Sequence, residues 1–215
     1  MPFNQLLWSF PPSFIRSLTG FWLTWDKSPG GKRIYLTFDD GPDPDVTPAV
    51  IEILEGFNAR ATFFLSGRKA GQEPHLVTRL RESGHALGNH GFDHLRGFFT
   101  PASKYIADLE RCASHVPSLL FRPPYGSLTP LLVRRLRQMG YEICMWTVNS
   151  RDYSSRVSPT TCLQQSIRFT RDGSIVLFHD TGQSAENCLY TLPRFLDHFS
   201  GLGYSFPALE MPGPR

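Results

Sequence analysis

Short apolar runs, separated by segments with helical spacing of apolar positions, make up most of the chain after residue 30. The run Arg33–Asp39 (RIYLTFD) is rich in β-branched and aromatic residues and is bounded by glycine and proline, which predicts a strand. Several such runs are apolar throughout instead of alternating, which is typical of strands covered on both faces. Six further runs predict strands: Ala61–Gly67, His85–Asn89, Leu119–Arg122, Glu142–Asn149, Ser174–His179 and Tyr204–Leu209.

Helices are predicted between these strands. Four share a start signal, a hydroxyl residue followed by proline, because the hydroxyl can accept a free backbone N–H and proline at the first helical position loses no hydrogen bond. The alternation of strand and helix predicts an α/β fold of parallel strands joined by crossover helices, as an open doubly wound sheet or a small incomplete barrel. The starts are Thr47-Pro48, Thr100-Pro101, Thr129-Pro130 and Ser158-Pro159, and two further helices fit near His75–Glu82 and Cys188–Phe199.

The first 30 residues differ from the rest because they are dominated by apolar and aromatic side chains. Pro11-Pro12, Arg16 and Gly20 interrupt the apolar run, and no basic residue precedes Arg16, so the segment fits neither a signal peptide nor a transmembrane helix. We therefore expect residues 1–30 to form an aromatic arm packed on a domain of residues 31–215. A membrane-surface or partner-binding anchor is the alternative, and a cytoplasmic location is the default expectation.

Charge and cysteine content narrow the classes of protein further. The formal net charge is only +3 and the basic residues form no long run, so no nucleic-acid partner is expected. No pair of cysteines has the spacing C-x-x-C, which makes free thiols the expectation and fits a reducing compartment. The four cysteines are Cys112, Cys144, Cys162 and Cys188.

Polar and ionisable side chains follow five of the seven predicted strands. In parallel α/β folds the carboxyl ends of the strands meet at one edge, and active sites form there. We therefore expect these side chains to converge on one site. They are Asp39-Asp40, His90 with His94, Arg122 with Tyr125, Asn149 with Asp152, and His179-Asp180.

His90 and His94 have the spacing H-x-x-x-H, which on one helical turn lets two imidazoles face one cation. Asp40 would complete a set of two histidines and one carboxylate. Such a set leaves positions open for water and substrate, as a catalytic metal needs.

A hydrolytic mechanism is consistent with these residues. The cation would activate a water, Asp39 would take its proton as general base, and His179 would protonate the leaving group as general acid. Arg122 near Asp39 would keep that carboxylate ionised, and a carboxylate near His179 would keep the imidazole protonated. A backbone N–H near Tyr125 would hold the oxyanion.

These residues resemble the motifs of the polysaccharide deacetylase family, carbohydrate esterase family 4, over roughly residues 33–209. The family's fold is a distorted (β/α) barrel with about seven parallel strands and the active site at their carboxyl ends, so the resemblance implies that fold. It also implies one divalent cation, zinc first and cobalt, nickel or manganese as alternatives. The motifs are TFDDGP at 37–42, NHGFDH at 89–94, RPPY at 122–125, Asp152-Tyr153 and Leu177-Phe178-His179.

The resemblance implies a role for each matching residue. Asp39 matches the general base, which Arg122 orients, and His179 matches the general acid, which Asp152 tunes. The implied metal ligands are Asp40, His90 and His94. The residues implied on the acyl side are Tyr125, whose backbone N–H is the oxyanion donor, and Leu177 and Tyr153, which wall the acetyl pocket.

Three residues depart from the family pattern. Gly91 stands where the family has Ser or Thr, whose hydroxyl braces the metal loop, so this departure bears on metal affinity. Tyr153 replaces a tryptophan of the acyl pocket, and Asn149 stands where many members carry Asp. No departure removes a ligand, the base or the acid, so an active enzyme is expected.

Three functional hypotheses remain open. The leading one is a metal-dependent hydrolase that removes acetyl groups from an N-acetylated sugar or polysaccharide. The second places a small amide, a formamide or an O-acetyl ester in the same site, because no carbohydrate-binding module or export signal accompanies the motifs. The third is a non-catalytic binding protein on a retired enzyme fold, which predicts a broken metal or acid set that this sequence does not have.

Overall fold

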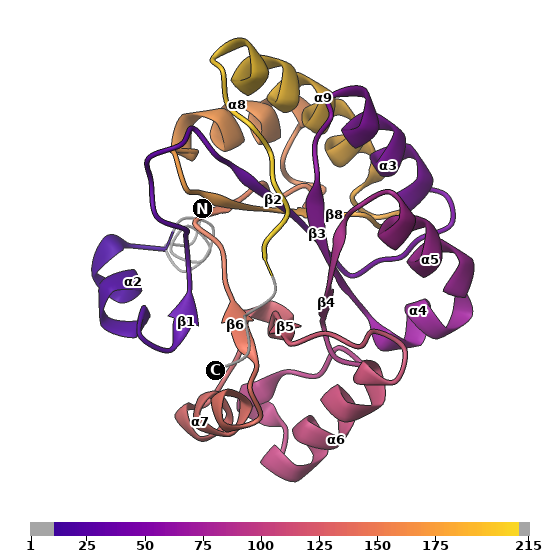
Figure 1. Cartoon of the computed structure of the whole chain (residues 1–215), viewed down its shortest axis with the longest axis vertical. Helices are drawn as coiled ribbons and strands as arrows, with labels where there is room; N and C mark the ends of the chain where they lie inside the picture. The colour runs from indigo at the N-terminus through magenta and orange to yellow at the C-terminus, as the bar shows by residue number, and fades with distance from the viewer. Residues whose placement is uncertain (1–10, 211–215) are drawn as a thin grey trace.

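The computed structural model describes residues 11–210, whose strands form a single sheet in which every neighbouring pair is parallel. The strand order is β1-β6-β5-β4-β3-β2-β8-β7, and the sheet curls into an incomplete barrel with helices on its outside (Figure 1). The prediction of a distorted (β/α) barrel is confirmed. The strands are β1 Leu23–Thr24, β2 Tyr35–Asp39, β3 Ala61–Leu65, β4 Ala86–Asn89, β5 Leu120–Phe121, β6 Glu142–Cys144, β7 Val148–Asn149 and β8 Ile175–His179.

Two of the four predicted hydroxyl caps are confirmed. Thr129 accepts the backbone N–H of Leu132, and Ser158 accepts that of Thr161. The cap prediction is wrong for Thr47 and Thr100, whose hydroxyls instead donate to Asp180 and to the Arg96 carbonyl. The helices are α2 Ser13–Thr19, α3 Thr47–Gly56, α4 Gly67–Gln72, α5 Pro74–Glu82, α6 Ala102–Ala113, α7 Pro130–Gln138, α8 Pro159–Phe169 and α9 Ala185–Gly201, with 3-10 turns η1 Gly97–Phe99 and η2 Pro124–Gly126.

Residues 11–210 form eight strands where the sequence predicted about seven, and two predicted strands are wrong in detail. Tyr204–Leu209 forms no strand, and Ser205 makes only an isolated bridge with Arg33, since Pro207 cannot donate to a ladder. Glu142–Asn149 splits into β6 and β7. β6 pairs with β1 and β5 whereas β7 pairs with β8, and near the break the buried Arg122 side chain donates to the carbonyls of Cys144 and Met145.

Residues 11–30, the described part of the predicted arm, contribute a strand to the sheet. β1 pairs with β6, with Leu23 opposite Ile143, and this strand was not predicted. Trp25 is buried, and its indole N–H donates to the hydroxyl of Thr19 at 2.8 Å, which links the arm's strand to α2. Residues 1–10 of the predicted arm lie outside the described residues. No helix within residues 11–210 is long and apolar enough to cross a bilayer.

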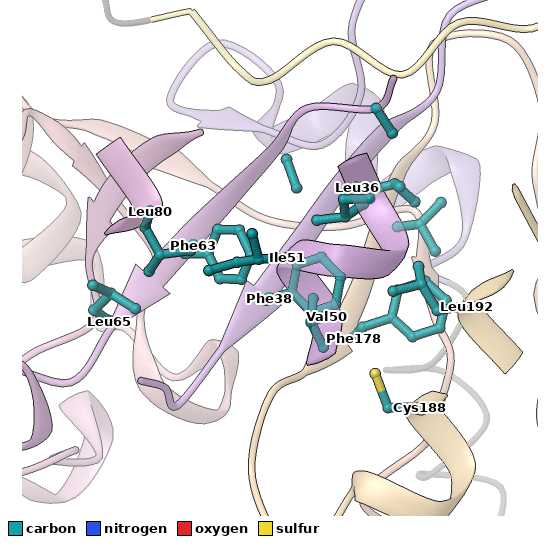
Figure 2. Close-up of a cluster of buried hydrophobic side chains, with 14 of the residues drawn as sticks. Leu36, Phe38, Val50, Ile51, Phe63, Leu65, Leu80, Phe178, Cys188 and Leu192 are labelled. Carbon is teal, nitrogen blue, oxygen red and sulfur yellow. The ribbon is translucent and has the colours of Figure 1, made fainter. Parts of the chain in front are cut away.

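The core lies between the sheet and the outer helices. Leu36 and Phe38 of β2 pack with Val50 and Ile51 of α3 in a cluster that also takes in Phe178 of β8 (Figure 2). All five residues of β2, β3 and β8 are buried, which confirms the prediction of strands covered on both faces. The four cysteines are free and buried, as expected.

Strand alternation positions the site. Because Leu36 and Phe38 face the helices, Thr37 and Asp39 of β2 face the barrel interior, since successive side chains of a strand point to opposite faces. On β8 the same alternation turns Leu177 and His179 inward. Asp39 is the register partner of His179, so the parallel pairing of β2 with β8 sets these two side chains next to each other.

Candidate active site

Asp40, His90 and His94 meet at the carboxyl end of the sheet. One oxygen of Asp40 lies 3.0 Å from Nε2 of His94 and 3.4 Å from Nε2 of His90, and the three donor atoms all lie within 4.8 Å of one another. Atoms that bind one zinc ion at about 2.0–2.2 Å lie about 3–3.5 Å apart, so the spacing fits a shared cation. His90 is buried while Asp40 and His94 are partly exposed, which leaves one side of the set open to solvent.

The two histidines are held by a loop after β4. The expectation of one helical turn is wrong, since residues 90–94 are not helical and His94 has a left-handed backbone with φ 54°. A turn of the loop therefore brings the rings together, with centroids 5.0 Å apart. Nδ1 of His90 lies 2.8 Å from the carbonyl oxygen of Arg122, and a proton on Nδ1 leaves Nε2 free to bind a cation.

The charged groups of the donor set shift the pKa values of one another. Burial alone would raise the pKa of Asp40, but hydrogen bonds with His90 and His94 outweigh it and hold the pKa below its usual range. Burial alone would lower the pKa of His90, and the carboxylates of Asp39 and Asp40 raise it instead. The set therefore favours an ionised carboxylate, which is the form that binds a metal.

The two carboxylate oxygens of Asp39 have different surroundings. The guanidinium of Arg122 donates to Oδ1 at 2.8 Å, while Oδ2 points toward the donor set and lies 3.8 Å from Nε2 of His90. Arg122 is fully buried and also donates to the hydroxyl of Thr37 and to the Cys144 and Met145 carbonyls. A buried guanidinium with this many partners holds the carboxylate in a fixed position.

His179 is oriented by Asp152. Oδ1 of Asp152 lies 2.8 Å from Nδ1 of the imidazole, and Oδ2 accepts the backbone N–H of His179 at 2.7 Å. Burial alone would lower the pKa of His179, but the charge and hydrogen bond of Asp152 outweigh it and raise the pKa to about 9. The imidazole is therefore protonated at neutral pH and can act as an acid through Nε2.

Tyr125, Leu177 and Tyr153 border the same region. Tyr125 has a left-handed backbone with φ 58°. The centroid of its ring lies 4.5 Å from that of the His94 ring. The rings of Tyr153 and His179 meet edge to face, with their centroids 5.0 Å apart. Leu177 is buried and lies two residues before His179 on the same face of the strand. Tyr125 thus lies beside the donor set, and Tyr153 and Leu177 lie beside His179.

Several of these residues have backbone conformations that side chains rarely adopt. Asp40, His94 and Tyr125 all have positive φ without being glycine. Such conformations cost free energy and persist only where the surroundings enforce them, and they concentrate at functional sites. Three of the six described non-glycine residues with positive φ therefore lie at this site, and the others are Lys32, Asn58 and Arg151.

Asp108 supports the histidine loop, although no sequence motif points to this residue. Its two carboxylate oxygens accept the backbone N–H groups of Phe92 and Asp93 at 2.8 and 2.9 Å. Gly91 has φ 77°, and a Cβ there would come within 2.9 Å of Asp108. The loop is therefore braced by a carboxylate from α6, at a position where the family's Ser or Thr would not fit without a shift.

Asn149 and Asp180 have supporting positions. Asn149 accepts the backbone N–H of Arg151 and so shapes the turn that carries Asp152. Asp180 is fully buried and accepts the hydroxyl of Thr47 at 2.6 Å, which ties the start of α3 to the end of β8. Burial raises the pKa of Asp180 to about 7.

Both the sequence and the fold are similar to those of known proteins. A peptidoglycan-N-acetylglucosamine deacetylase of Bacillus cereus is 31% identical over 197 residues, which span 87% of this chain and 91% of the relative. A chitooligosaccharide deacetylase of Azorhizobium caulinodans is 34% identical over 189 residues, or 84% and 89% of the two chains. A solved peptidoglycan N-acetylglucosamine deacetylase shares the fold, with a TM-score of 0.85 at 24% identity over 90% of this chain and 94% of that chain.

The polysaccharide deacetylase family profile matches residues 26–144, which is more than half of the 215 residues. The two curated relatives extend the similarity over most of the chain, including the region of Asp152 and His179. The protein belongs to the polysaccharide deacetylase family.

Proposed function

We propose that this protein is a metal-dependent hydrolase that removes acetyl groups from an N-acetylated sugar polymer. The observation that carries the proposal is the pairing across β2 and β8, which sets an Arg-bound carboxylate and an Asp-bound imidazole beside one cation-binding set. The names of the curated relatives, which are peptidoglycan and chitooligosaccharide deacetylases, support the substrate class.

Asp40, His90 and His94 would hold the cation. Two imidazole nitrogens and one carboxylate oxygen suit zinc, and cobalt, nickel or manganese can also bind such a set. When bound, the cation would activate a water and polarise the acyl oxygen.

Asp39 and His179 divide the proton transfers. Oδ2 of Asp39 faces the donor set while Arg122 holds Oδ1, so Asp39 can accept the proton of the attacking water. His179 carries a proton at neutral pH because Asp152 stabilises the imidazolium. It can therefore donate to the departing amine, which would otherwise leave poorly.

The acyl group would lie between Tyr125, Leu177 and Tyr153. The backbone N–H of Tyr125 is the proposed donor to the acyl oxygen as charge develops there. Leu177 is buried and apolar and suits the methyl group of an acetyl substituent. Tyr125 and Tyr153 are partly exposed, so their rings can also contact the sugar.

A substrate panel tests the proposal. The protein, loaded with zinc, cobalt or nickel, is incubated with N-acetylglucosamine oligomers, peptidoglycan fragments, small amides, formamides and O-acetyl esters, and acetate or formate release is measured. We expect acetate from the N-acetylated oligomers. Turnover confined to small amides or esters would favour the second hypothesis, and no release from any substrate would support the non-catalytic one.

Asp152→Asn should move the pH dependence of the reaction. Burial lowers the pKa of His179 and the charge of Asp152 is the main cause that raises it to about 9, so without that charge the pKa falls although Asp40 and Asp39 still raise it, and the acid loses its proton at lower pH. The alkaline limb of the kcat–pH profile should shift toward acid by at least about one pH unit, which corresponds to about 1.4 kcal/mol. Asp197→Asn, the same change on the exposed face of α9, should leave the profile in place.

The same pair predicts a pH dependence of stability. A histidine whose pKa is raised in the folded state stabilises the fold fully below pH 6.5, and the contribution is lost as the pH rises through about 9. Urea unfolding of the wild type should show this loss between those pH values. The loss should be smaller in Asp152→Asn, and an unchanged slope would contradict the ion pair's role.

Asp108→Asn should weaken metal binding without touching a ligand. An amide can accept only one of the two backbone N–H bonds that Asp108 accepts, so the loop carrying His90 and His94 loses part of its support. Loss of such supporting contacts typically costs about 10–100-fold in metal affinity. Zinc affinity by competition with a chelating dye measures the effect, with Glu110→Gln on the exposed face of α6 as the matched control.

A further inference from the structure

Helix α2 presents apolar side chains to solvent. None of its residues is buried, and Phe14 and Leu18, one turn apart, are 63% and 72% exposed. Phe21, in the turn that follows, continues the same spacing at 83% exposed and packs its ring against Trp22 at 5.6 Å. Figure 1 shows α2 at the edge of the molecule, so this stripe lies on an outer face. Clustered exposed aromatic and aliphatic residues mark interaction sites.

A second stripe of the same segment borders an apolar groove. Ile15, Thr19 and Trp22 form one wall, with the spacing of consecutive helical turns. Leu128, just before α7, and Val133, in its first turn, form part of the other wall. The groove has a volume of about 720 Å³. Since Trp22 contacts the ring of Phe21, the groove and the exposed stripe belong to one continuous face.

Positive charge borders this face. Arg134 and Arg137 of α7 line the groove, and no acidic residue lines it. Neither arginine makes an ion pair with another described residue. By contrast, Arg16 on the other side of α2 pairs with Asp26, so its charge is compensated. The apolar face is therefore complementary to a partner that is apolar inside and negatively charged at its surface.

We propose that this face, formed by α2, the turn to β1 and the start of α7, docks on an anionic lipid bilayer. Phe14 and Leu18 of α2, followed by Phe21 and Trp22 in the next turn and with arginine nearby, have the composition of a segment that lies in a membrane interface, where apolar side chains enter the headgroup region. Unpaired arginines add attraction to anionic lipids.

Docking in this orientation would bring the active site near the membrane. Gly126 lines the groove and directly follows Tyr125, whose ring packs on His94 of the cation-binding set. The bound face and the carboxyl end of the sheet are therefore neighbours. The enzyme would work on substrate held at or close to a bilayer surface.

Vesicle sedimentation of the full chain tests the proposal. Vesicles of phosphatidylcholine with 30% phosphatidylglycerol are compared with pure phosphatidylcholine, at low and high salt, and bound protein is measured in the pellet. We expect at least tenfold tighter binding to the anionic vesicles and weaker binding as salt rises. The triple variant Phe14→Ser, Leu18→Ser, Phe21→Ser should lose most binding to both vesicles, and Arg134→Glu with Arg137→Glu should lose the preference for anionic lipid.

Matched controls separate the face from general effects. Leu202→Ser removes a half-exposed apolar residue at the end of α9, and Arg81→Glu reverses an exposed charge on α5, so both should bind like the wild type. Circular dichroism verifies that each variant is folded. No sedimentation of the wild type, or equal sedimentation of the triple variant, overturns the proposal. A dimer in light scattering that the triple variant abolishes, without vesicle binding, would assign the face to a second copy of the chain instead.

Discussion

His94→Ala should abolish activity by removing one of the three donors of the cation-binding set. Nε2 of His94 lies 3.0 Å from Oδ1 of Asp40, on the side of the set that is open to solvent, and its loss leaves two donors for the cation. Loss of a contact that only supports a metal ligand costs about 10–100-fold in metal affinity. Because His94 is itself a donor, its loss should lower zinc affinity by more than that. Acetate release should fall to background at zinc concentrations that saturate the wild type.

A histidine outside the site provides the control. His198→Ala changes an exposed residue of α9 and should leave zinc affinity and acetate release as in the wild type. Zinc content after dialysis and acetate release are measured on the same preparations. Full zinc binding with full activity in His94→Ala would exclude this residue from the site.

Asp39→Asn should lower kcat by about 10²–10⁴-fold while zinc binding persists. The amide cannot take the proton of the attacking water, and loss of a general base has effects of this size. Asp39 is also the carboxylate partner of the buried Arg122, so its neutralisation leaves an uncompensated charge. The free energy of unfolding should therefore fall by about 3–5 kcal/mol.

A second variant separates the two effects. Asp39→Glu keeps the negative charge beside Arg122 but moves the carboxylate, so it should recover much of the stability and little of the rate. Asp197→Asn is the matched control for charge neutralisation at an exposed position. Rates of Asp39→Asn close to those of the wild type, measured on folded and zinc-loaded protein, would assign the base to another group.

The sheet and the ends of its strands were predictable because both follow from local patterns. The apolar runs at β2, β3 and β8 match strands that are buried on both faces, and Asp39 and His179 directly end two of them. Once parallel strands are inferred, side chains at their carboxyl ends must share one edge.

The features that were missed depend on contacts between distant segments. β1 has only two residues, and its pairing with β6 comes from tertiary packing that no local pattern encodes. The break between β6 and β7 separates a segment that pairs with β1 and β5 from one that pairs with β8, and these partners lie far away in the sequence. Asp108 has the sequence context of an ordinary polar helix residue, and only the fold shows that it faces the loop of His90 and His94.

The pairing of Asp39 with His179 has a consequence for how such a protein can diversify. The two residues are opposite each other on neighbouring strands, so the distance between them is inherited from the ladder spacing of about 4.8 Å and not from any loop. Insertions and deletions in the connections around the rim can then reshape substrate choice while this gap stays constant. Substrate choice can therefore change during evolution while the spacing of the two proton-transfer residues is kept.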